Sequence, residues 1–330
     1  MLRLFQSTGP LQFVLLLMYS ALVHMHGLLY PPAWPEQMHT FLSHWLLDEH
    51  NDLQQIPVFY VALVQLILIT ATGLALSTLM QRFKLVNKPT LLPAMTFVLL
   101  CSFFPGLLLA LPEVWSGLLI LAILFKVFSA YNKQRCDMTY FDAGALSVLA
   151  TLIYWPSAIL LVFSMLAMLR MRSTTFREFV IYLTGVITPV FLLGTLVFWF
   201  GGPDALRDLQ MPALSFFRGQ AELFSTTVIV KVSLIGAVLI LALLLFAEKI
   251  SSNLIQIRRY MSVTIWLLLA GIAALGTAFP AAESAFYPLL LPAAMVISYY
   301  FFHSRQLLYT EGAHAGLLIA TIILQYITFV

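Results

Sequence analysis

Charge is what this sequence has least of. Lys and Arg number 17 and Asp and Glu 14 in 330 residues, so charged residues make up 9% of the chain and apolar residues 61%. Soluble domains carry about 25% charged and about 45–50% apolar residues. The composition therefore excludes a soluble enzyme, a DNA-binding domain and a disordered region, and no nucleic-acid partner is expected. It predicts an integral membrane protein that contacts membrane lipid and has little mass outside the bilayer.

Cysteine is almost as scarce. The two cysteines, Cys101 and Cys136, show neither metal-site spacing nor a disulfide framework, so both are expected as free thiols. The chain also lacks an internal repeat, a low-complexity tract and a linker. We therefore expect one transmembrane helical domain over residues 1–330. The opening apolar stretch is too long for a signal-peptide core and lacks a cleavage site, so it is interpreted as a retained first span.

Long apolar runs are abundant, and they predict an all-α, polytopic fold. A bilayer core requires about 20 apolar residues in helical form, and helices satisfy their backbone hydrogen bonds internally. By this rule the sequence divides into about eleven membrane helices. They are expected at 11–30, 57–80, 91–111, 113–131, 142–155, 157–170, 179–200, 226–246, 261–279, 285–303 and 313–330.

The placement of basic residues predicts the orientation. If the N-terminus is cytoplasmic and the loops alternate, 14 of the 17 basic residues fall on the cytoplasmic side. These are Arg3, Arg82, Lys84, Lys88, Lys126, Lys133, Arg135, Arg170, Arg172, Arg177, Lys249, Arg258, Arg259 and Arg305. Only Arg207, Arg218 and Lys231 fall outside. This asymmetry agrees with the positive-inside rule and predicts a cytoplasmic N-terminus and a periplasmic C-terminus in a bacterial inner membrane.

The segment 142–170 is too long for one upright helix and too short for two full spans. Pro156 removes a backbone donor and disfavours helix at Trp155, so the chain is expected to break there. Basic residues flank both ends of the segment. We therefore expect a hairpin of two short helices whose apex does not fully cross the membrane. The alternative is one kinked, strongly tilted helix, which would put a basic flank outside.

The first outer loop, residues 31–56, has the pattern of a short amphipathic helix near 36–49. Met38, Phe41 and Trp45 recur at helical spacing on one face, and polar residues occupy the other. Such a helix lies along the membrane surface, with Trp45 at headgroup level. The loop is acidic and contains no Lys or Arg.

An acidic outer loop directly after the first span, together with a short-helix hairpin and a basic loop, resembles the C-type glycosyltransferases. These are integral-membrane enzymes that use polyprenyl-phosphate-linked sugars. The resemblance covers residues 1–60 and 120–200 as a pattern of elements. Members often have an acidic pair very soon after the first span, whereas here Glu36 stands alone and the Asp48-Glu49 pair follows later. The motifs FDAG, LIYWPS, RSTTFREF and LTGVITP within 141–200 also resemble an uncharacterised family of bacterial inner-membrane proteins.

The resemblance to glycosyltransferases implies a carboxylate that accepts the proton of the acceptor hydroxyl and cations that stabilise the leaving lipid phosphate. Glu36 is the first candidate for the base, followed by Asp48 and Asp52, with Glu49 beside them. Arg207, Arg218 and Lys231 are the cation candidates by elimination, because they are the only basic residues expected outside. The further substrate-binding candidates are His39, His44 and Trp155. Lys231 stands out because it lies about one turn inside an expected span. No metal or other cofactor is expected, and the polyprenyl-phosphate lipid would be a substrate.

Simpler explanations exist for several of these residues. Loop acids are usually solvated, Lys231 can extend to the headgroups, and Arg218 can pair with Glu222 at i,i+4 spacing. Two other functions therefore remain open. The chain can be a non-catalytic scaffold or anchor for other cell-envelope membrane proteins, or a transporter. A transporter ranks last because the expected spans hold few ionisable residues and no inverted repeat is visible.

Overall fold

The computed structural model describes residues 2–30, 57–133, 135–208, 226–277, 283–304 and 307–327. Within these ranges every regular element is a helix, as the apolar runs predict. The main helices are α1 (Pro10–Val23), α2 (Met25–Leu29), α4 (Val58–Arg82), α5 (Leu92–Ser102), α6 (Leu111–Ser129), α7 (Asp137–Ile153), α8 (Ile159–Met171), α9 (Phe176–Asp208), α10 (Thr226–Ser252), α11 (Ile255–Thr277), α12 (Tyr287–His303) and α13 (Leu307–Ile327). Short 3-10 turns are η1 (Leu2–Phe5), η3 (Pro105–Leu108), η4 (Trp155–Ala158) and η5 (Glu283–Phe286).

Six helical segments of the described chain are long and apolar enough to cross a membrane. They are Val58–Arg82, Leu111–Ser129, Phe176–Gly202, Thr226–Ser252, Ile255–Thr277 and Glu283–His303. The chain is thus a multi-pass membrane protein by the length and composition of its helices. Each of the eleven expected segments contains helix, but the number of about eleven crossings is not confirmed, because several helices fall short of the roughly 20 residues that a bilayer core requires.

The expectation of one continuous helix over 91–111 is wrong. Helix α5 ends at Ser102 after 11 residues, and the chain passes through η3 before α6 begins at Leu111. Pro105 explains the break, because the residue before a proline is driven out of the helical region. Phe104 accordingly has φ −119° and ψ 82°. The same effect of a proline on the preceding residue predicts the helix break at Pro156.

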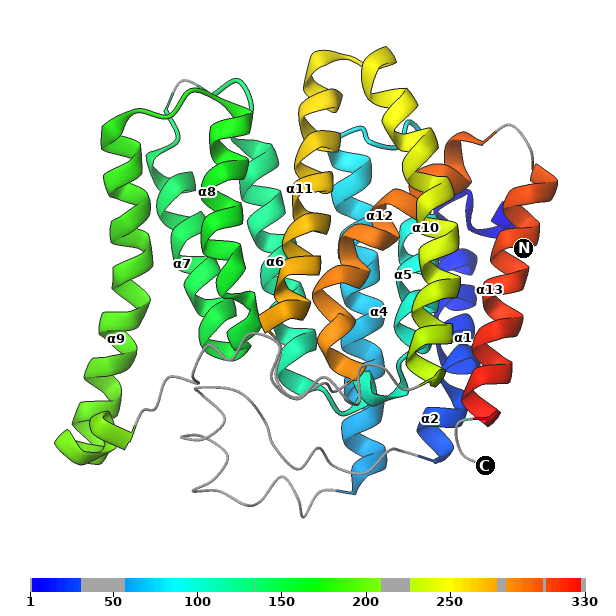
Figure 1. The fold of residues 1–330 in the computed structure, drawn as a ribbon, viewed down its shortest axis with the longest axis horizontal. Coiled ribbons are helices and arrows are strands. Elements are labelled where there is room, and N and C mark those ends of the chain that lie inside the picture. Colours follow the sequence, from blue (N-terminus) through cyan, green and yellow to red (C-terminus); the bar gives the residue numbers. More distant parts are fainter. Residues whose placement is uncertain are drawn as a thin grey trace.

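The expected helix break near Pro156 is present. Helix α7 has 17 residues and α8 has 13, with η4 between them, and the two helices pack against each other. Tyr154, just before the turn, has extended backbone angles. Figure 1 shows the chain descending through α7 and returning through α8, so the two form a hairpin with both outer ends at the same end of the bundle.

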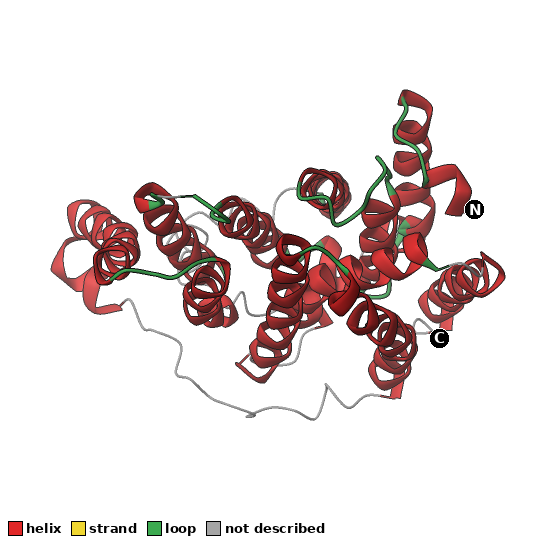
Figure 2. Cartoon of the chain, turned by 90° about the horizontal axis from the view of Figure 1, so that it is seen from above, coloured by secondary structure: helices red, strands yellow, loops and turns green. Residues whose placement is uncertain are grey.

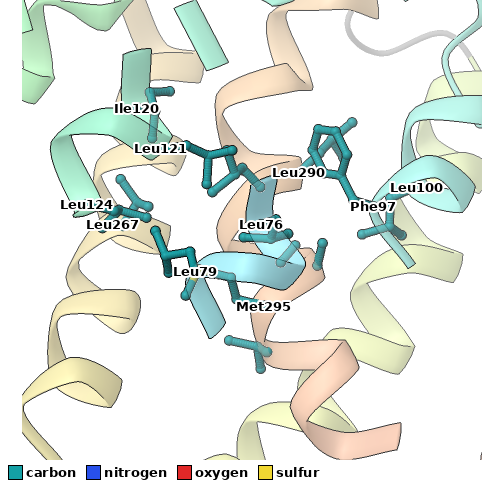
Figure 3. Packing of buried hydrophobic residues seen from close by; sticks show 14 of the residues in the cluster. Leu76, Leu79, Phe97, Leu100, Ile120, Leu121, Leu124, Leu267, Leu290 and Met295 are labelled. Atoms are coloured by element: carbon teal, nitrogen blue, oxygen red, sulfur yellow. The ribbon is translucent and has the colours of Figure 1, made fainter. Parts of the chain in front are cut away.

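The helices form an elongated array, with α9 at one edge and α1 and α13 at the other (Figures 1 and 2). The best-buried part lies where α4, α5, α6, α11 and α12 meet, and their leucine, isoleucine and phenylalanine side chains interlock there (Figure 3). Helix α12 is the centre of this array: 83% of its span is buried, compared with 17% for α9. The exposed apolar faces of the outer helices are what a hydrocarbon solvent requires.

Charge is divided between the two ends of the array. The turns that follow α4, α6, α8 and α10 all lie at the upper end in Figure 1. Described basic residues in or beside these turns are Arg82, Lys84, Lys88, Lys126, Lys133, Arg135, Arg170, Arg172, Arg177, Lys249, Arg258 and Arg259. Among the described side chains, Lys231 near the start of α10 is the single Lys or Arg toward the lower end. The expected amphipathic helix near 36–49 lies outside the described residues.

Candidate functional site

The lower end of the array contains an ion pair between two distant parts of the chain. Lys231 lies on the second turn of α10, and Glu283 is the first residue of η5. The Nζ atom of Lys231 donates to Oε1 of Glu283 at 2.5 Å. The Lys231 side chain is 2% exposed and that of Glu283 is 29% exposed. The lysine therefore lies fully inside the protein, and only the carboxylate has partial access to the outside.

Two breaks in the helical backbone enclose this pair. The 3-10 turn η3 packs against η5. The rings of Phe104 and Phe286 stack with their centroids 5.0 Å apart, and the Lys231 ammonium lies 5.8 Å from the Phe104 centroid. A cation near an aromatic face is attracted by the ring quadrupole. Helices broken in this way are tolerated inside a membrane only where they are buried in protein or line a wet cavity.

A second carboxylate, Glu113, lies beside η5 in the first turn of α6. Its Oε1 atom accepts a hydrogen bond of 2.8 Å from the Ser284 hydroxyl. Its Oε2 atom is buried and has no hydrogen-bond partner among the described residues. A negative charge is favourable in the first turn of a helix, because the amide groups there point toward it. The interaction with these amide groups stabilises the Glu113 carboxylate only in part, because Oε2 has no hydrogen-bond partner among the described residues.

Tyr287 continues the polar cluster toward the interior. The ring lies in a slot on α6 that exists because residue 117 is a glycine: a Cβ atom there would lie 2.3 Å from Cε1 of Tyr287. Phe97 packs edge-on against the same ring at 5.9 Å. The Tyr287 side chain is fully buried, and its hydroxyl also has no hydrogen-bond partner among the described residues.

Two of the predicted site residues, Lys231 and Trp155, have described side chains. Lys231 is in the cluster just described, and Trp155 is a half-buried residue of η4. Helix α11 contacts both η4 and η5, and the charge of Glu113 acts on the phenol of Tyr154, so the hairpin apex and the cluster are neighbours. Arg207 lies near the end of α9, past the break at Gly202, and its side chain is outside the described part. The remaining candidates, Glu36, His39, His44, Asp48, Asp52 and Arg218, lie outside the described residues, as does Glu49.

Sequence reasoning did not assign Glu113, Glu283 or Tyr287 to the site. The signal that could have found them is an acidic or aromatic residue next to a proline inside an apolar run. Glu113 follows Pro112, and Tyr287 precedes Pro288. A proline in the first turn of a helix marks the place where an apolar segment is interrupted, and polar groups at such a place lie inside the membrane protein.

The upper end holds polar contacts of a different kind. Glu178 accepts from the backbone amide of Thr175 at 2.9 Å and pairs with Arg172 at 3.1 Å, which caps the start of α9. Arg177 pairs with Asp137 at 2.7 Å. These contacts fasten the ends of α7, α8 and α9. Among the described residues, no group of three His, Cys, Asp or Glu side chains could hold a metal ion.

Comparisons with models of protein families, with curated proteins and with solved structures give no match to this chain.

The chemistry available at the lower end follows from its groups. Glu283 is a partly exposed carboxylate held by a buried ammonium, and Glu113 is a half-buried residue whose buried Oε2 atom has no hydrogen-bond partner among the described residues. An ionisable group inside a membrane protein is costly and is most often retained for a function. The cluster can bind a hydrogen-bond donor or a cation through its carboxylates, and it can accept a proton.

Proposed function

We propose that the chain is a bacterial inner-membrane glycosyltransferase that acts on polyprenyl-phosphate-linked sugars in envelope glycan assembly, with its site on the outer face. The observation that carries the proposal is the Lys231–Glu283 pair, a partly exposed carboxylate held by a fully buried cation beside two broken helices. Helix α2 ends and α4 begins at this same end of the array (Figure 1), and the acidic segment 31–56 lies between them in the sequence. The distribution of basic residues favours the outside for this end.

The reaction would proceed by displacement at the anomeric carbon. The acceptor hydroxyl forms the new C–O bond while the bond between the sugar and the lipid phosphate breaks, and the hydroxyl proton passes to a carboxylate. Glu36, Asp48 and Asp52 in the outer segment supply this base. Arg207 and Arg218 stabilise the phosphate that leaves, because charge-assisted hydrogen bonds to phosphate are strong. His39, His44 and Trp155 contact the sugars, and Lys231 holds Glu283 in position at the mouth of the cluster.

A second candidate function is that of a non-catalytic scaffold in an envelope complex. The observation in its favour is that Lys231 is already neutralised by Glu283. A cation held in this way joins α10 to the start of α12 and leaves less charge for a lipid phosphate. A scaffold would use the cluster only to hold its helices together.

The two functions are separated by cells that lack the chain and are complemented with single variants. If it is an enzyme, Glu36→Ala, Asp48→Ala or Asp52→Ala abolishes restoration of the envelope glycan profile while the protein still reaches the membrane. Asp142→Asn, at the opposite end of the array, is the matched control and restores the profile. A profile that is unchanged in all three loop variants rules out the enzyme.

A direct binding measurement complements the genetics. Purified protein in lipid vesicles is exposed to a polyprenyl phosphate that carries a photoreactive group, and labelled peptides are identified by mass spectrometry. The enzyme is expected to be labelled near η3, α10 and η5, and unlabelled polyprenyl phosphate should compete. A scaffold would show labelling that is spread over the lipid-facing helices and insensitive to competition.

A further inference from the structure

Three side chains, one each from α4, α6 and α12, have buried polar atoms without hydrogen-bond partners among the described residues. These atoms are Oε1 and Nε2 of Gln65, Oε2 of Glu113 and the hydroxyl of Tyr287. Gln65 and Tyr287 are both 0% exposed. A buried polar group without a partner costs about 1–3 kcal/mol, and a charged group costs more. Three such groups in one interface indicate that something else supplies their partners.

The helix register brings the three side chains together. Helices α4 and α6 run in the same direction and are fixed at the upper end by Phe83, which packs edge-on against Phe125 and Phe128 at 5.6 and 5.2 Å. Further down, the Tyr287 ring fills the slot at Gly117, and its hydroxyl lies near that of Thr72, which donates to the Leu68 carbonyl at 2.7 Å. Thr72 and Gly117 are therefore level with each other, on the faces of α4 and α6 that meet α12.

The positions of Glu113 and Gln65 relative to this level follow from the rise per residue of an α-helix. Glu113 is four residues before Gly117, one turn and about 6 Å lower on the same face of α6. Gln65 is seven residues before Thr72, two turns and about 10 Å lower on the same face of α4. The two levels differ by about 4–5 Å, which is within the combined reach of a glutamate and a glutamine side chain. Glu113 and Gln65 thus lie about 5 Å apart along the helix axes, and both lie one to two turns below the Tyr287 level.

The region between these side chains lies inside the protein, since Gln65 and Tyr287 are 0% exposed. Val58 begins α4, and Thr72 lies about 20 Å along the helix from it at 1.5 Å per residue. A bilayer core is about 30 Å thick, so the Tyr287 level is well inside it if α4 crosses upright. The full burial of Gln65 and Tyr287 favours a small occupant over a sugar or a lipid headgroup.

The charges of the surrounding side chains indicate what kind of occupant the site would bind. Lys231 and Glu283 neutralise each other, whereas Glu113 forms no ion pair with a described residue. The unpaired atoms include a carboxylate oxygen, an amide oxygen and a phenol oxygen. Oxygen ligands are those that hard cations prefer, and broken helices with free carbonyls are where membrane proteins hold Na⁺. The backbone is broken on both sides of Glu113, at η3 and at η5.

We propose that Gln65, Glu113 and Tyr287 form an intramembrane site for one monovalent alkali cation of the size of Na⁺, with Glu113 as its charged ligand. This site is separate from the sugar chemistry proposed above and does not depend on it. The cation neutralises Glu113 and joins α4, α6 and the start of α12.

The test uses the purified full-length chain in detergent and ²²Na⁺ as the probe. Equilibrium binding is measured at constant ionic strength, with choline chloride as the balancing salt. We expect one Na⁺ per chain, and a thermal unfolding temperature Tm that rises with NaCl but not with choline chloride. A wild-type protein that binds no ²²Na⁺ and unfolds at the same Tm in both salts overturns the proposal, because Glu113 is then neutralised by a proton.

Variants identify the ligands. Glu113→Gln should abolish Na⁺ binding, and Gln65→Leu and Tyr287→Phe should each weaken it by about tenfold or more, as the loss of one charge-assisted contact does. Asp142→Asn, whose carboxylate pairs with Lys126 at the opposite end, should bind Na⁺ like the wild type. Wild-type Na⁺ binding that persists in Glu113→Gln assigns the cation elsewhere and also overturns the proposal. None of these measurements involves a sugar or a polyprenyl lipid, so their failure leaves the proposed function untouched.

Discussion

The Nζ atom of Lys231 lies 2.5 Å from Oε1 of Glu283, although 52 residues separate them in the chain. The ammonium is buried and the carboxylate is 29% exposed. Their pairing explains why a lysine is tolerated inside the apolar helix α10, because a buried charge is tolerated when an opposite charge and hydrogen bonds accompany it. It also joins α10 to the turn that precedes α12.

The pair should therefore contribute to stability in a way that a double-mutant cycle detects. Lys231→Met leaves Glu283 without its partner and should lower the free energy of unfolding by about 3 kcal/mol. Glu283→Gln should have a similar effect, and the double variant should lose less than the sum. Unfolding in detergent measures all three. The control is the pair of Lys126 and Asp142, also 2.5 Å apart but 40% and 35% exposed, which should couple by about 1 kcal/mol or less. Equal coupling in the two pairs would contradict this account.

The close approach of α7 and α9 depends on two glycines. A Cβ atom at Gly185 would lie 2.2 Å from the carbonyl oxygen of Phe141, and one at Gly144 would lie 2.5 Å from that of Tyr182. The obstacle in each case is backbone, so Gly185→Ala and Gly144→Ala should each destabilise by about 1–3 kcal/mol.

Gly194 on the same helix α9 provides the matched control for this prediction. A Cβ atom at Gly194 meets nothing within 4 Å. Gly194→Ala should therefore be neutral or stabilise by up to about 1 kcal/mol, since alanine is the better helix former. The Tm values of the three variants in detergent check both statements. A Gly185→Ala protein as stable as Gly194→Ala would show that α7 and α9 are not in contact.

A buried hydroxyl network joins the hairpin to α9. The Ser147 hydroxyl donates to Ser164 at 2.9 Å, Ser164 and Tyr182 hydroxyls lie 2.8 Å apart, and Tyr182 donates to the Leu161 carbonyl at 2.6 Å. Tyr182→Phe removes the central member and should destabilise by about 0.6–2 kcal/mol, the range for hydrogen bonds between membrane helices.

The control for the network is a hydroxyl that bonds within its own helix. Thr188 donates to the Thr184 carbonyl one turn earlier on α9. Thr188→Val should change the unfolding free energy by a few tenths of a kcal/mol at most. Chemical unfolding followed by tryptophan fluorescence distinguishes the two variants. Equal effects would mean that the network contributes nothing between helices.

The orientation assigned from charge is open to a labelling experiment. In a background with Cys101 and Cys136 replaced by alanine, single cysteines are introduced at Lys133 in the upper turns and at Glu36 in the first loop. The positive-inside rule predicts that a membrane-impermeant maleimide labels position 36 in intact cells and position 133 only after permeabilisation. The reverse labelling pattern would mean that the topology is inverted and that the polar cluster lies on the cytoplasmic side.

Much of the fold was predictable because it depends on local properties. The apolar runs predicted helices in all eleven segments, and Pro156 predicted the break between α7 and α8. Pro105 carried the same information and was missed, which made α5 too long. The length of each helix, and therefore the number that can cross a bilayer, was less predictable, since helix ends depend on packing as well as on sequence.

The candidate site was only partly predictable. Lys231 was recognisable from its position inside an apolar run, but nothing near it in sequence pointed to Glu283. The contact between Ser284 and Glu113 joins residues 171 positions apart. Such partners are chosen by which helices pack together, and that choice involves many weak contacts distributed over the whole interface.

Composition and segment pattern by themselves determined that this chain is a helical membrane protein with its basic residues at one end, because transfer into lipid acts on each segment almost independently. Only the tertiary structure decided that a lysine on one helix meets a glutamate on another. It alone also decided that the Tyr287 ring of α12 lies in the slot at Gly117 of α6. The physical reason is that burial leaves a polar group only the partners that its neighbouring helices bring to it.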